Sequence, residues 1–133
     1  MITSDARNEG ELDTALRALP RNPEDGVLVT ADRLFYANKT KITRAIGKAG
    51  VAATFPFRDY HDDGALMSYG PSTKELARKM AVYVDKILKG ARPGDLPIEQ
   101  ISVYELIVDL RVARELGLKV PQDLLLRADE VIR

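Results

Sequence analysis

Polar and aromatic side chains follow three short apolar runs of the sequence, and these are the residues best placed to do chemistry. The runs are expected strands, and strands of a parallel sheet end on the same side, where α/β proteins bind ligands. Asp32 suits an ammonium group, and Arg58 suits a carboxylate. An aromatic side chain after the second or third run suits stacking on a ligand ring. The predicted ligand-binding residues are Thr30, Asp32, Phe57, Arg58, Ser68 and Tyr69.

Each of these residues also has a purely structural interpretation. Asp32 is equally well explained as a turn residue or helix cap. Arg58 is better explained as a surface ion-pair partner, because three carboxylates follow it in the same loop, and such a pair contributes little stability. Tyr69 is as readily a packing residue as a stacking one. The carboxylates near Arg58 are Asp59, Asp62 and Asp63.

The sequence offers no convincing catalytic or metal centre. His61 is the only histidine, and a single imidazole among loop carboxylates predicts a solvated loop rather than a metal site. Ser68 has no evident histidine partner, and neither a Gly-x-Ser-x-Gly elbow nor a glycine-rich phosphate loop is present. We therefore expect no enzyme, no catalytic residue, no metal and no cofactor.

Composition narrows the functional classes further. The 133 residues suffice for one domain, and 20 basic residues balance 20 acidic ones. A net charge of zero gives no reason to expect nucleic acid or an anionic membrane as a partner. Residues 1–10 have neither a basic start nor an apolar stretch, so they do not form a secretory signal peptide.

Helical patterns alternate with short apolar runs along the chain, which predicts an α/β fold with a largely parallel sheet and flanking helices. The expected helices span 9–19, 37–49, 72–90 and 111–116, with a last one from Pro121 to Ile132. Strands are expected at 27–30, 51–55, 65–69 and 104–110, and a loop at 58–64. Glycines at 50, 90 and 117 are expected to end helices.

The longest helix, 72–90, organises the prediction. Ser72 suits its N-cap, and Glu75 three residues later suits the second half of a capping box. Apolar residues recur along one face at Leu76, Met80, Tyr83, Val84, Ile87 and Leu88. A stripe of this size needs a partner, so we expect a homodimer, formed by packing or exchanging this segment.

Several short segments resemble one known family. They are Lys86–Gly90, Pro93 with Asp95–Pro97, the strand from Glu105 with Ala113 and Leu116–Leu118, and Leu125 with Ala128–Glu130. Together they resemble the C-terminal part of periplasmic substrate-binding components of an ABC-transporter family, whose better-known members bind aromatic amino acids. The resemblance implies a partial type I periplasmic-binding-protein fold with Rossmann-like lobes.

The resemblance also implies a function. It places 1–60 and 101–133 in a second lobe and 65–90 in a first lobe. It places the ligand contacts in three loops, at Thr30–Asp32, Pro56–Arg58 and Ser68–Gly70. It implies a solute-binding component of an ABC importer, with an amino acid or similar small molecule as ligand, an ABC permease as partner and a periplasmic location. Such proteins are more than twice this length, and a chain without a signal peptide, if complete, would be cytoplasmic.

Two other classes stay open at this stage. One is a non-catalytic α/β interaction domain that dimerises through the long helix and binds no ligand. The other, an α/β enzyme or phosphoacceptor regulator, needs an acidic cluster with a nearby lysine at the strand ends. Asp32 alone does not make that cluster.

Overall fold

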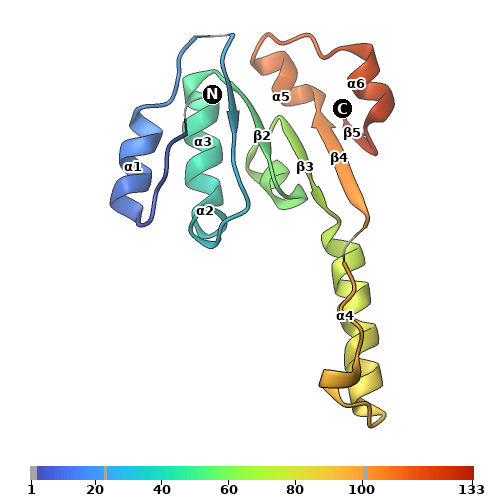
Figure 1. The fold of residues 1–133 in the computed structure, drawn as a ribbon. Coiled ribbons are helices and arrows are strands. Elements are labelled where there is room, and N and C mark those ends of the chain that lie inside the picture. The colour runs from blue at the N-terminus through green and yellow to red at the C-terminus, as the bar shows by residue number, and fades with distance from the viewer. Residues whose placement is uncertain (1–2, 23, 101) are drawn as a thin grey trace.

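The computed structural model describes residues 3–22, 24–100 and 102–133, which form one mixed sheet with flanking helices (Figure 1). The strands lie side by side in chain order: β1 (Gly26–Leu28), β2 (Ala52–Phe55), β3 (Met67–Pro71), β4 (Tyr104–Asp109) and β5 (Glu130–Ile132). The pairs β1–β2, β2–β3 and β4–β5 are parallel, whereas β3 and β4 are antiparallel. The α/β class and the largely parallel sheet are therefore confirmed.

The helices follow the expected order with some differences in their limits. They are α1 (Glu9–Arg17), α2 (Arg33–Ala37), α3 (Lys39–Ala49), α4 (Thr73–Leu88), α5 (Leu110–Glu115) and α6 (Gln122–Arg127), with 3₁₀ segments η1 (Arg58–Asp63) and η2 (Pro93–Asp95). Gly50 ends α3 in the left-handed conformation, at φ 71°, as predicted. No helix within the described ranges is both long and apolar enough to cross a membrane.

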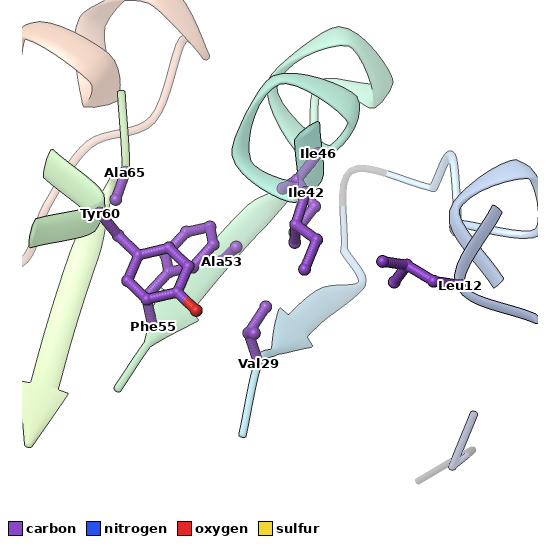
Figure 2. Packing of buried hydrophobic residues seen from close by; sticks show 8 residues of the cluster. All are labelled: Leu12, Val29, Ile42, Ile46, Ala53, Phe55, Tyr60 and Ala65. Atoms are coloured by element: carbon purple, nitrogen blue, oxygen red, sulfur yellow. The ribbon is translucent and has the colours of Figure 1, made fainter. Parts of the chain in front are cut away.

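The core lies between one face of β1 and β2 and the helices α1 and α3 (Figure 2). Successive strand residues point to opposite faces, so Ala53 and Phe55 both face these helices. Ile42 and Ile46, one turn apart on α3, meet them there. The ring of Phe55 stacks on Tyr60 with 4.9 Å between centroids. This packing fixes where β2 ends and where η1 begins.

α4 leaves the sheet at the end of β3 and projects away from the other elements, and the chain returns beside it to β4 (Figure 1). We call residues 72–100 the arm. Tyr83 Oη donates to the Pro97 carbonyl, and Lys79 Nζ donates to the Gln100 carbonyl at 3.2 Å. All of α4 is described, and none of its residues is buried. The arm is therefore held by its own return segment and leaves its apolar face open.

The N-terminus of α4 forms only half of the predicted capping box. Ser72 Oγ accepts from the Glu75 N–H at 3.4 Å, as expected of an N-cap. The Glu75 carboxylate instead pairs with Arg78. The reciprocal bond of the box is thereby replaced by an ion pair within the helix.

The prediction of one helix over 37–49 was incomplete, because a separate helix, α2, precedes it. Asp32 caps α2, and Asn38 ends it, its N–H donating to the Leu34 carbonyl at 3.1 Å. Asn38 makes no side-chain cap to α3.

The prediction of a last helix reaching Ile132 was wrong. Asp129 binds Leu106 twice, donating its N–H to the Leu106 carbonyl at 2.8 Å and accepting the Leu106 N–H on its carboxylate at 2.8 Å. These bonds start an extended pairing along β4. Val131 and Ile132 therefore belong to β5, a strand that was not predicted.

Candidate functional site

The ends of β1, β2 and β3 lie on one side of the sheet, which we call the carboxyl end. Because β4 and β5 run the other way, their first residues, Tyr104 and Glu130, lie on the same side. Thr30 is exposed just beyond β1, and Asp32 follows it. Phe57 and Arg58 follow β2 directly. The fold thus brings the first two predicted ligand-binding segments to one end of the sheet. Ser68 and Tyr69, which were expected to follow the third strand, instead lie within β3, because that strand continues to Pro71 in its pairing with β4.

Asp32 is the N-cap of α2. Its Oδ1 accepts a hydrogen bond from the Leu34 N–H at 2.7 Å, which satisfies a backbone donor of the first helical turn. The structural interpretation of Asp32 is therefore confirmed. A ligand contact through the same carboxylate stays a prediction.

Arg58 forms a two-pronged ion pair with Glu130, with Nη2 donating to Oε1 at 2.9 Å and Nη1 donating to Oε2. The hydrogen bonds from Arg58 hold the pKa of Glu130 below its usual range. An ion pair was expected, but its partner lies on β5 rather than among Asp59, Asp62 and Asp63. A ligand carboxylate would have to displace Glu130 to reach this guanidinium.

Two aromatic groups lie at the carboxyl end. Tyr69, 58% exposed, stacks on Tyr104 with 5.8 Å between centroids and 29° between ring planes. Half-buried Phe57 meets the ring of Tyr36 edge-on at 5.9 Å. Tyr36 and Tyr104 were not among the predicted residues. Tyr104 could have been found from the pairing of β3 with β4, which places it on the face of Tyr69.

Ser68 and His61 form a buried polar pair, with 3.0 Å between Ser68 Oγ and His61 Nε2. The prediction that His61 lies in a solvated loop was therefore wrong, and Ser68, for which the sequence showed no evident histidine partner, has one in His61. The physical reason is η1, which folds the segment back against β3 instead of leaving it in solvent. Burial lowers the pKa of His61 and favours the neutral imidazole.

The buried pair does not extend to a catalytic triad. Asp109 is buried too, but its carboxylate accepts hydrogen bonds from the Arg111 N–H at 2.8 Å and from the Arg111 guanidinium at 2.7 Å. Burial alone would raise the pKa of Asp109, but these bonds outweigh it and hold the pKa below its usual value. Asp109 therefore acts as the N-cap of α5.

Two of the three carboxylates around His61, Asp63 and Asp59, are engaged by the protein. Asp63 pairs with Lys39 at 2.6 Å, and this hydrogen bond lowers the pKa of Asp63. Asp59 accepts the hydroxyl of Tyr36 at 2.7 Å. Within the described ranges, no three His, Asp or Glu side chains gather in a way that could hold a metal ion.

Gly70 shapes the carboxyl end because the backbone leaving β2 passes directly over it. A Cβ added at Gly70 would overlap the carbonyl oxygen of Pro56. Any larger residue would push these segments apart. The end of β3 can therefore approach the segment after β2 only because residue 70 is a glycine.

Comparison with known protein families identifies the family of this chain. The model of the ABC transporter substrate binding protein family matches residues 1–132. The chain belongs to this family. No curated protein sequence matches the chain. Solved structures, in contrast, show the same fold.

A conserved domain protein from Vibrio cholerae superposes with a TM-score of 0.81 at 23% identity, over 95% of this chain and 42% of the other. An ABC domain from Streptococcus pneumoniae in complex with L-Trp gives a TM-score of 0.76 at 20% identity, over 92% and 40%. A ligand-free, open substrate-binding protein with adhesive properties from Clostridium difficile gives 0.59 at 18%, over 95% and 41%. The chain thus spans about two-fifths of each solved chain, with a periplasmic-binding-protein-like fold.

Proposed function

We propose that this protein is a solute-binding component of an ABC importer, with its ligand at the carboxyl end of the sheet. The observation that supports the proposal is the position of Asp32, Arg58 and Tyr69 toward the carboxyl end of three neighbouring parallel strands, in a member of a substrate-binding family. The family's non-catalytic character and the engaged Asp109 carboxylate also support the inference that the protein is not an enzyme.

The side chains at this end suit an amino acid or a similar small organic molecule. The Asp32 carboxylate complements an ammonium group, and the Tyr69–Tyr104 pair offers a flat apolar surface to a ring. Arg58 would bind a ligand carboxylate by exchanging it for Glu130, which keeps the charges balanced. The neighbour solved with L-Trp makes aromatic amino acids the first probes to test.

The arm supports a division of the chain between two lobes. We propose that residues 1–60 and 101–133 belong to a second lobe and 65–90 to a first lobe, whose remaining part would cover α4. The supporting observations are the open face of α4 and the coverage of only 42% of a matched solved chain. Closure of two lobes on a ligand would present a form that an ABC permease recognises. The proposed location is extracytoplasmic, as is normal for the family.

A binding experiment tests the proposal directly. We expect L-tryptophan, L-tyrosine or L-phenylalanine at millimolar concentration to raise the melting temperature of the wild type. Saturation at about a hundred times Kd stabilises by roughly 2.7 kcal/mol. Asp32→Asn should lose about half of the shift or more, whereas Asp123→Asn, an exposed acidic residue on α6, should keep it. No shift with any amino acid or small organic acid would refute the proposal.

A second proposal concerns association of the 133-residue chain. We propose that it forms a homodimer through α4, because successive residues 100° apart place the apolar side chains on about half of its circumference. Every charged residue of α4 lies on the other half. The open apolar residues are Leu76, Met80, Val84, Ile87 and Leu88. The same exposed apolar face also supports the alternative, in which the protein is an interaction domain that binds no ligand.

Two valines of α4 provide a matched test of this association. Val84 lies on the apolar half and Val82 on the charged half, and they are similarly exposed, at 54% and 48%. Val84→Lys should make the protein monomeric in light scattering, and Val82→Lys should leave the dimer intact. A wild type that is monomeric at every concentration would refute the homodimer without affecting the ligand proposal.

A further inference from the structure

The hydroxyl of Tyr60 is a buried polar group without a protein partner. Tyr60 is fully buried, and no atom of the described chain forms a hydrogen bond with its oxygen. Buried hydroxyls are nearly always paired, because leaving one unpaired costs free energy. Thr43 Oγ1 and His61 Nδ1 are unpaired as well, and the Tyr60 hydroxyl is thus one of three buried groups with hydrogen-bonding capacity left for a partner outside the described chain.

The direction of this hydroxyl relates it to the candidate site. Figure 2 shows the Tyr60 oxygen pointing toward Val29, on the side where β1 and β2 end. Asp32 follows Val29 by three residues at the carboxyl end. The hydroxyl thus points from the core toward the loops that carry the predicted ligand-binding residues.

We propose that the Tyr60 hydroxyl donates a hydrogen bond to the ligand, as the innermost polar group of the site at the carboxyl end. The inference rests on the proposed solute-binding function and adds a residue that the sequence did not identify. The acceptor would be a carboxylate or carbonyl oxygen of an amino acid whose ammonium group is bound by Asp32.

The chemistry of Tyr60 suits a donor. Burial, followed by the effects of Tyr36 and Asp32, raises the pKa of Tyr60 to about 12. The phenol is therefore protonated at neutral pH and keeps its hydrogen for an acceptor. A permanently neutral donor also avoids placing a second negative charge beside Asp32.

Access to the hydroxyl depends on Tyr36. The Tyr36 ring lies against Tyr60 with 6.3 Å between centroids and is itself 44% exposed, so it forms the outer layer. It is carried by the five-residue α2, which has no buried residue, and its hydroxyl is tied to Asp59 at 2.7 Å. Rotation of one half-exposed side chain is fast compared with binding, so it can uncover the inner ring.

The first part of the test needs no ligand. If the hydroxyl is reserved for a ligand, Tyr60→Phe should melt at the wild-type temperature or above, because it removes an unpaired polar group. Tyr83→Phe serves as the matched control, since it removes a hydroxyl that donates to Pro97 in the arm. A fall of several degrees for Tyr60→Phe alone would mean that the hydroxyl has a structural partner, such as a bound water, and would overturn the inference.

The second part uses L-tryptophan, L-tyrosine and L-phenylalanine as probes in calorimetric titrations. We expect Tyr60→Phe to bind about tenfold more weakly than the wild type, and Tyr83→Phe to bind equally well. Equal affinity of wild type and Tyr60→Phe would overturn the inference and leave the proposed function intact. Failure of the wild type to bind any probe would refute the proposed function itself, and the role of Tyr60 with it.

Discussion

Substitutions of Asp32 separate its role as a helix cap from its proposed role as a ligand-binding group. Asp32→Ala removes the hydrogen bond to the Leu34 N–H, which is 2.7 Å long. Loss of an N-cap costs about 1 kcal/mol, which lowers the melting temperature of a domain of this size by roughly 3–6 °C. Asp32→Asn keeps an oxygen in the capping position, so its melting temperature should equal that of the wild type.

Ligand affinity, unlike the melting temperature, should fall in both variants. A hydrogen bond between charged groups contributes about 1.5–3 kcal/mol, so both variants should bind the amino acid roughly 10- to 150-fold more weakly. Thermal unfolding followed by circular dichroism, with calorimetric titration of the same samples, measures both effects. If Asp32→Asn binds as well as the wild type, Asp32 is only a cap. If Asp32→Asn melts as low as Asp32→Ala, the capping argument fails instead.

Three further substitutions test the surroundings of the site. Burial lowers the folded-state pKa of His61, so below about pH 6.5 the unfolded chain binds more protons than the folded one. The free energy of unfolding should therefore fall as the pH drops from about 6.5 toward the folded-state pKa. In thermal melts between pH 8 and 5, His61→Asn should lose this contribution of His61 to the pH dependence. Gly70→Ala should cost about 1–3 kcal/mol in denaturant unfolding because its Cβ meets Pro56, while Gly94→Ala, in open space, should cost far less; equal losses would contradict this. Asp109→Ala should lower stability by about 1–2 kcal/mol through loss of the α5 cap, and Asp109→Asn should recover most of it in the same assay.

Local signals predicted most of the elements correctly. The apolar runs at 27–30, 51–55 and 65–69 each contain part of one of three neighbouring parallel strands, because β-branched and apolar residues favour extended backbone with one face in the core. Gly50 and Gly117 ended their helices with positive φ, as residues without a Cβ readily do. These are properties of a few adjacent residues, and a sequence displays them directly.

Several wrong predictions concern contacts that form only when the sheet is assembled. β5 exists because Asp129 binds Leu106, and a helical pattern reaching Ile132 gives no sign of that bond. The partner of Arg58 is Glu130, 72 residues away, although three carboxylates lie within five residues of it. The burial of His61 against Ser68 requires η1 to fold over β3. Side-chain partners of this kind follow from the assembled sheet rather than from local spacing.

The arm is attached to the sheet at one end only, so a small movement at the attachment displaces its far end. Its only covalent links to the sheet are the adjacent strands β3 and β4, which meet at the pair Pro71 and Tyr104, next to the close approach at Gly70. The 16 residues of α4 extend roughly 24 Å from this attachment at 1.5 Å per residue. A change of about 10° in the direction of α4 at this point moves its far end by about 4 Å. Pro71 and Tyr104, at the attachment, therefore influence the position of Leu88 at the far end of α4 without contacting it.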